Sequence, residues 1–132
     1  MPDIREAQIN FATTDVTLTT TGEAVVVSSG AIVTPFQTHR IVILAWGQLT
    51  TGAGTTAVTP RIRRGTATTG TLVGEANAEQ VKAAAGSTEP FIILVSEDRA
   101  DQESVEYSLT LQQTAATGNG TVLQAGILVL VL

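Results

Sequence analysis

The sequence predicts an all-β protein: an antiparallel β-sandwich, jelly-roll-like, of seven to eight strands with an extended N-terminal arm. Apolar and polar residues alternate with period two in several segments, as is typical of strands with one buried face. Turn clusters rich in glycine and threonine separate these segments at roughly 8–12-residue spacing, which is typical of sandwiches. Neither a linker nor a change of composition divides the 132 residues. We therefore expect one sandwich domain over residues 16–132 and an arm over residues 1–15.

Seven segments carry the strand pattern, in chain order residues 24–28, 40–50, 56–64, 71–74, 90–97, 105–112 and 121–132. Pro60 cannot donate a ladder hydrogen bond, which predicts an edge or a bulge for the third segment. Residues 75–85 are rich in helix formers and fit one helical turn as well as a strand with a loop. Asn119-Gly120, between two alternating segments, predicts a hairpin with a type I′ turn.

Both ends of the chain predict contacts beyond a simple domain. Residues 126–132 are apolar on both faces, so this strand is either central in a sheet or buried by another subunit. Residues 1–15 are polar and weakly periodic but carry Ile4, Ile9 and Phe11, which indicates an extended arm.

The composition excludes several classes of function. A net charge of −5 and a pI of about 4.6 argue against nucleic-acid binding, which depends on Lys and Arg neutralising phosphates. The absence of cysteine excludes a disulfide framework, a thiolate metal site and a cysteine nucleophile. Only 14% of residues are charged, well below the usual quarter or so. Such a surface favours extensive coverage by protein partners.

No segment predicts export or insertion into a membrane. The first residues lack the basic and apolar regions of a signal peptide. The apolar runs 41–46 and 127–132 are far shorter than the roughly 20 residues that span a bilayer. We therefore expect no membrane partner and a chain made in soluble form in the host cytoplasm.

The residues that could carry chemistry do not form a recognisable active site, so we predict no enzyme, no cofactor and no metal. His39, the only histidine, has no Gly-x-Ser-x-Gly serine to activate. Residues 52–57 match a dinucleotide fingerprint but lead into a strand, so we interpret them as a hairpin loop. The acidic residues of 97–103 could ligate calcium or serve glycoside hydrolysis. They lack EF-hand spacing and aromatic sugar platforms, which favours a solvated loop paired through Arg99.

Arg61, Arg63 and Arg64 form the one basic patch of the sequence. Arg61 and Arg63 share a strand face and could grip an acidic partner surface. A charged edge strand that discourages edge pairing explains them equally well.

Residues 41–132 resemble small structural proteins encoded in the virion gene clusters of tailed bacteriophages. The resemblance rests on residues 44–50 (LAWGQLT), 63–74 (RRGTATTGTLVG), 107–114 (YSLTLQQT) and 120–122 (GTV). It implies a jelly-roll or related sandwich, often trimeric, that decorates the capsid or forms part of a tail or fibre. No functional residue is carried over, because the function of such proteins lies in their surfaces.

The sequence thus favours a virion protein that decorates and stabilises a phage capsid. Its predicted partners are itself, as a homotrimer, and the major capsid protein or another virion protein. The alternative is a trimeric receptor- or glycan-binding domain of a tail fibre or appendage. A hydrolase that uses the acidic loop is a third hypothesis. The predicted interface residues are Ile4, Ile9, Phe11, Phe36, Arg61, Arg63, Leu128, Leu130 and Leu132.

Overall fold

The computed structural model describes residues 6–19, 22–33, 39–75, 81–99 and 104–132. The described residues form β-strands and no helix. They are β1 (Glu6–Phe11), β2 (Val16–Thr17), β3 (Glu23–Ser28), β4 (Ile32–Val33), β5 (His39–Thr51), β6 (Thr55–Arg64), β7 (Leu72–Glu75), β8 (Val81–Ala84), β9 (Thr88–Arg99), β10 (Ser104–Val105), β11 (Tyr107–Ala116) and β12 (Gly120–Val131). The described residues contain no helix that could cross a membrane.

The short strands are interrupted parts of eight longer ones. β1 and β2 both pair with β12 and count as one strand, and β7 and β8 both pair with β6 and count as another. β3 pairs with β11 and β4 pairs with β10, so β3 with β4 and β10 with β11 also count as one strand each. Counted in this way, the first strand pairs with the eighth, the second with the seventh, the third with the sixth and the fourth with the fifth. This is the pairing of one long antiparallel ribbon rolled into two sheets, the jelly roll. It confirms the predicted fold class.

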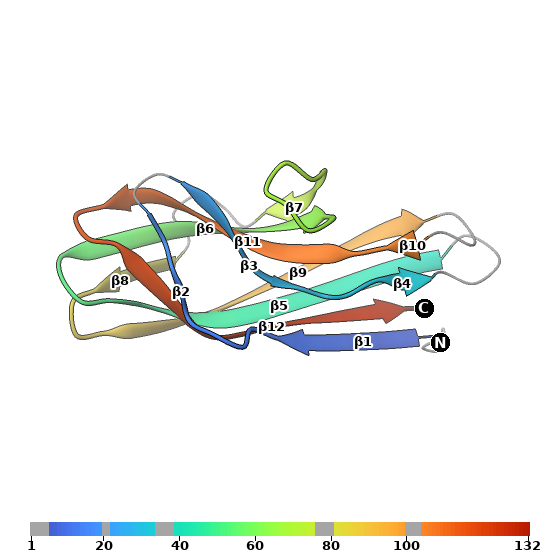
Figure 1. Ribbon diagram of the computed structural model, residues 1–132, viewed down its shortest axis with the longest axis horizontal. Coiled ribbons are helices and arrows are strands. Elements are labelled where there is room, and N and C mark those ends of the chain that lie inside the picture. The colour runs from blue at the N-terminus through green and yellow to red at the C-terminus, as the bar shows by residue number, and fades with distance from the viewer. Residues whose placement is uncertain (1–5, 20–21, 34–38, 76–80, 100–103) are drawn as a thin grey trace.

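Sheet A has the order β1-β12-β5-β9, and sheet B has the order β3-β11-β6-β7 (Figure 1). The inner faces of the two sheets supply the core, which includes Ile41, Ile43, Leu49, Ile62, Leu109, Leu111, Ile127 and Val129, all of them fully buried. β12 lies between β1 and β5, so the doubly apolar last strand is central in its sheet. The start of β1 and the end of β12 lie side by side at one end of the sandwich (Figure 1).

The predicted type I′ hairpin at Asn119-Gly120 is wrong. β11 belongs to sheet B and β12 to sheet A, and neither residue has a positive φ. The turn between β11 and β12 instead forms hydrogen bonds with the turn between β5 and β6. That second turn also connects sheet A to sheet B, so it is a corner and not the hairpin loop predicted for residues 52–57. The amides of Thr117 and Gly118 donate to the carbonyl of Thr55 at 2.8 and 3.2 Å. A Cβ on Gly118 would lie 2.0 Å from the oxygen of Ala53, so only glycine permits this approach.

Two further expectations are resolved by the sheet order. β6 is an interior strand, so the predicted edge position is wrong. Pro60 pairs with Leu111 of β11, and on the other side of β6 the strand β8 pairs with residues 55–58 and β7 with residues 61–63. Of the segment 75–85, the described residues are strand and turn, as in the alternative of a strand with a loop. Residues 6–11 of the predicted arm form β1 at the edge of sheet A.

Candidate assembly surface

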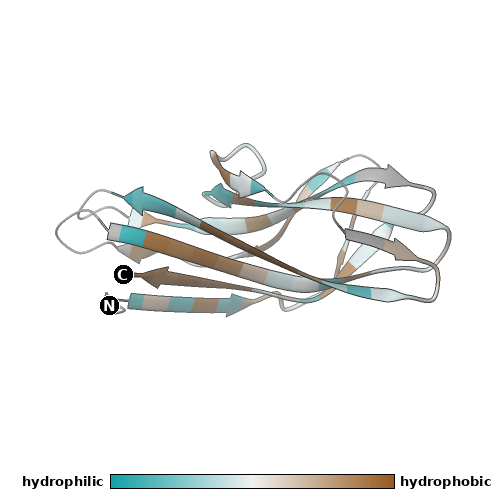
Figure 2. Ribbon diagram, turned by 180° about the vertical axis from the view of Figure 1, so that it is seen from behind, coloured by the Kyte–Doolittle hydropathy of each residue, from teal (hydrophilic) through white to brown (hydrophobic). Residues whose placement is uncertain are grey.

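Apart from Ser96, the outward-facing positions in the middle of sheet A are apolar on all four of its strands. The side chains concerned alternate with those that enter the core, and the strand register aligns them in three rows. The rows are Ala7, Leu130, Val42 and Ser96; then Ile9, Leu128, Leu44 and Leu94; then Phe11, Gly126, Trp46 and Ile92. We call these twelve positions the apolar face. Figure 2 shows the apolar residues of β12 beside the alternating polar and apolar residues of β1.

Nothing in the described structure covers this face. Ile9 and Phe11 are 52% and 56% exposed, and Ile92 and Leu94 are 68% and 66% exposed. Strand and residue spacings give the twelve positions a footprint of about 400 Å². The largest apolar patch of a monomeric protein is commonly of this size and is often functional.

An ion pair closes one end of the apolar face. The Nε of Arg40 on β5 lies 2.7 Å from Oδ1 of Asp98 on β9, and the two side chains are 57% and 59% exposed. Such an exposed pair contributes little to stability, but it neutralises both charges next to the apolar rows.

The other end is hollowed beside a β-bulge. On β12 three residue steps separate Leu123 from Gly126, whereas on β5 two steps separate their partners. The extra residue places Gln124 at φ 51°, in the left-handed region that residues other than glycine rarely adopt. Next to it lies an open depression of 760 Å³, lined by Phe11, Trp46, Gln48, Pro90, Ile92 and Gln124, among others.

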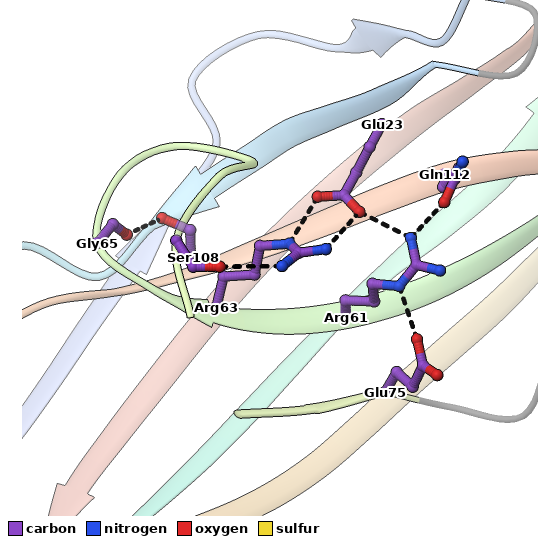
Figure 3. Close-up of polar contacts among 8 residues, drawn as sticks. Glu23, Arg61, Arg63, Gly65, Glu75, Ser108 and Gln112 are labelled. Carbon is purple, nitrogen blue, oxygen red and sulfur yellow. Dashed lines mark hydrogen bonds and ion pairs between the residues drawn. The ribbon is translucent and has the colours of Figure 1, made fainter. Parts of the chain in front are cut away.

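The outer face of sheet B is charged instead of apolar (Figure 3). Glu23 accepts hydrogen bonds from Nε of Arg63 and from Nη1 of Arg61, both at 2.7 Å. Arg61 also donates to Glu75 at 2.7 Å and to the side-chain oxygen of Gln112. Burial raises the pKa of Glu23, but the hydrogen bonds and charges of Arg63 and Arg61 outweigh it and hold the pKa below its usual value. The two arginines therefore already bind carboxylates of their own chain.

The structure distributes the predicted interface residues over two surfaces. Ile9, Phe11, Leu128 and Leu130 are on the apolar face, and Leu132 follows Leu130 at its end, where its amide donates to the carbonyl of Arg40 at 3.0 Å. Arg61 and Arg63 are on the opposite sheet. Ile4 and Phe36 lie outside the described residues.

Sequence reasoning missed the apolar side chains that β5 and β9 contribute to the apolar face. The missed residues are Val42, Leu44 and Trp46 on β5 and Ile92 and Leu94 on β9. Their signal was present, because residues 41–46 and 91–95 are apolar at successive positions and so must show apolar side chains on both sides of a strand.

The acidic cluster does not form one site in the described structure. Glu97 points into the sandwich, where it accepts hydrogen bonds from the hydroxyl of Tyr107 at 2.5 Å and from Nε of Arg64 at 3.0 Å. Asp98 points outward to Arg40, and residues 100–103 lie outside the described part. Within the described ranges no group of three His, Cys, Asp or Glu residues could hold a metal ion. His39 begins β5, paired with Arg99.

No family model and no curated protein matches the sequence. Among solved structures, the chain is similar to one titled as the structure of the Gx strain of infectious bursal disease virus. The TM-score is 0.57 at 11% identity, over 98% of this chain and 34% of the other. Weaker alignments link it to a mutant VP2 protein of that virus (TM-score 0.46, 13% identity, 99% and 37% covered) and to Bacillus endospore appendages described as disulfide-linked pili (0.41, 20%, 100% and 96%).

The chain spans about a third of the length of the two viral chains. At these identities the first similarity shows a shared fold. Fold and surface together define a jelly-roll sandwich with one charged outer face and one apolar outer face.

Proposed function

We propose that this chain is a non-enzymatic structural protein of a virus particle, and that it decorates and stabilises the capsid of a tailed bacteriophage. The uncovered apolar face carries the proposal, because an exposed apolar patch favours contact with another protein. The jelly-roll fold, shared with a viral particle protein, supports the viral part. The resemblance of residues 41–132 to phage virion proteins supports the phage part.

The size of the apolar face favours a capsid lattice over a single free partner. A stable, specific interface buries roughly 800 Å² on each side, about twice the footprint of about 400 Å² estimated for this face. One such contact is weak, although each Leu or Ile that becomes fully buried contributes roughly 1.5–3 kcal/mol. Several weak contacts made at once to a repeating surface bind tightly through avidity. A homotrimer, the state that the resemblance implies, would supply three such faces.

The charge distribution points to the same partner chemistry. Within the three rows no residue is charged, and at their end Arg40 and Asp98 neutralise each other. An uncharged, apolar strip of capsid protein complements this face, whereas a polyanion or a strongly charged protein does not.

Binding to empty capsids of the virus that encodes the chain tests the proposal. We expect Leu94→Glu to abolish co-sedimentation with capsids, because it places a charge in the middle row of the face. Leu72→Glu is the matched control: Leu72 is also an exposed leucine, at 43%, but it lies on β7 of sheet B. Capsid binding by Leu94→Glu at the level of the control, with the fold intact by circular dichroism, would show that the apolar face is not the contact.

The predicted arm is a separate part of the proposal. Because β1 pairs with β12 and carries one quarter of the apolar face, removing residues 1–14 would also remove part of the sheet. Deletion of residues 1–5 is therefore the cleaner test. We expect this variant to fold and to bind capsids less tightly; unchanged binding would remove the arm from the proposal.

A further inference from the structure

We propose that the depression at the bulged end of the apolar face binds a carbohydrate, with a pyranose ring stacked on Trp46 and its hydroxyls held by Gln48 and Gln124. The site is distinct in chemistry from the rest of the face, which is aliphatic. It does not depend on the proposed function.

Aromatic side chains gather at this one place. The whole sequence has one Trp, one Tyr and three Phe, and Phe11, Trp46 and Phe91 all line the depression. Phe11 is exposed and Phe91 is buried beneath. Aromatic platforms bind the C–H faces of sugar rings, and their scarcity in the sequence had counted against sugar binding.

Trp46 is held as a platform. A Cβ on Gly126 would lie 2.3 Å from Cζ2 and 2.6 Å from Cε2 of Trp46, so the indole occupies the space above Gly126 on the neighbouring strand. The ring of Phe11 meets it from the other side of that strand, with centroids 5.9 Å apart and an interplanar angle of 71°. This edge-to-face contact and the packing on β12 fix the indole against the sheet.

Two amide side chains flank the platform. Gln48 and Gln124 both line the depression, and among the described residues neither side chain has a hydrogen-bond partner. An amide offers two donors and an acceptor, which suits hydroxyl groups that donate and accept. A purely apolar occupant would displace water from both amides and would not replace the hydrogen bonds that the amides make to that water. The cost would be about 1–3 kcal/mol for each amide. The lining therefore selects an occupant with an apolar face and polar edges, as a pyranose has.

The backbone at Gln124 adds an independent reason. A φ of 51° in a bulge favours glycine, yet a glutamine stands here and is exposed toward the depression. Residues with a strained backbone are found mainly at functional sites, where their side chains have a role. Hydrogen bonding to a ligand is such a role.

Because Trp46 is the only tryptophan, its fluorescence reports on the site directly. The full chain is titrated with cellohexaose, xylohexaose and chitohexaose. We expect a saturable change of emission with at least one of them. The double variant Gln48→Ala with Gln124→Gly should weaken that binding by about tenfold or more, equivalent to about 1.4 kcal/mol. Glycine at 124 removes the amide but keeps the positive φ accessible.

Leu94→Glu serves as the control, because Leu94 belongs to the apolar face but does not line the depression. It should bind the sugar as the unaltered chain does while losing capsid binding, so the two proposals fail separately. Absence of response to all three oligosaccharides in fluorescence and calorimetry would overturn the assignment. So would sugar binding that is unchanged in the double amide variant.

Discussion

The hydroxyl of Tyr107 on β11 donates a 2.5 Å hydrogen bond to Oε1 of Glu97 on β9, and this bond joins the two sheets through the interior. The one N–H of Nε of Arg64 is shared between Oε1 and Oε2 of Glu97, at 3.0 and 3.1 Å. The tyrosine side chain is fully buried. This polar group lies at one end of a core that is mostly aliphatic.

Alkaline pH should destabilise the protein through this tyrosine. Burial raises the pKa of Tyr107 strongly, and the hydrogen bond to Glu97 raises it further. A raised pKa in the folded state means that the stabilisation is complete below the unfolded pKa, near 10.0, and is lost as the pH rises above it. We expect no tyrosinate absorbance from this single tyrosine until the chain unfolds.

Tyr107→Phe separates the hydrogen bond from the packing. The ring remains, but Glu97 loses one donor, and we expect a loss of about 1.5–3 kcal/mol in the free energy of unfolding at neutral pH. The difference between the variant and the unaltered chain should shrink as the pH rises above 10.0, because only the tyrosine is penalised there. A difference in urea unfolding that does not change with pH would contradict this linkage.

Acid should weaken the charged outer face of sheet B. The folded-state pKa of Glu23 is lowered, so its stabilisation is present above the unfolded value of 4.5 and is lost as the pH falls through the folded pKa. Glu23→Gln should cost about 1–3 kcal/mol at neutral pH, because Arg61 and Arg63, which are 17% and 18% exposed, lose the carboxylate that they share.

The exposed pair at the end of the apolar face is the matched control for Glu23→Gln. Asp98→Asn removes the partner of Arg40 where both side chains are more than half exposed, and we expect a change below about 1 kcal/mol. Urea titrations should show the full difference between Glu23→Gln and the unaltered chain at neutral pH. The difference should shrink as the pH falls below 4.5 toward the lowered folded-state pKa of Glu23. Equal costs for the two substitutions would show that the network on sheet B is no stronger than a surface pair.

Gly126 should resist even a small side chain. In Gly126→Ala the new Cβ would overlap Cζ2 of Trp46, so the indole must leave β12 and its contact with Phe11. We expect a loss of about 1–3 kcal/mol and a red shift of the tryptophan emission. Gly52→Ala is the control, because nothing lies within 4 Å of its Cβ position. An unshifted emission in Gly126→Ala would show that the indole does not depend on that space.

Most strands could be predicted from the sequence because their patterns are local. The alternation of Tyr107, Leu109 and Leu111 with polar residues needs only neighbours in the chain. The strand order could not be predicted in this way, since the pairing of β1 with β12 joins residues at opposite ends of the sequence. β1 itself was hidden because its apolar residues Ile9 and Phe11 face outward and its polar residues face the sandwich.

The same limit applies to the candidate surfaces. Leu94 and Ile9 lie in one row only because β9, β5, β12 and β1 are neighbours in one register. Asn119-Gly120 shows the opposite error, in which a strong local preference is overridden by the corner contacts that join two sheets. The ion pairs of Arg61 and Arg63 were likewise hidden, because Glu23 lies about 40 positions earlier in the sequence.

The bulge residue Gln124 offers a substitution that should stabilise the protein. Its φ of 51° costs a residue with a Cβ roughly 1–2 kcal/mol relative to the right-handed or extended regions. Gln124→Gly relieves this strain but adds freedom to the unfolded chain, so we expect a net gain of up to about 1 kcal/mol in the free energy of unfolding. Gln124→Val should lose about 1–3 kcal/mol, since β-branched residues avoid positive φ.

Urea unfolding of the three proteins compares these effects at one exposed position. We expect the free energy of unfolding to be highest with glycine, lower with glutamine and lowest with valine at position 124. This order follows from the backbone conformation alone, because among the described residues the side chain of Gln124 makes no hydrogen bond. If glycine proves less stable than glutamine, the amide must contribute in the absence of any ligand. The strain would then be balanced within the folded chain, and the argument that glutamine is kept there for a carbohydrate would lose its backbone support.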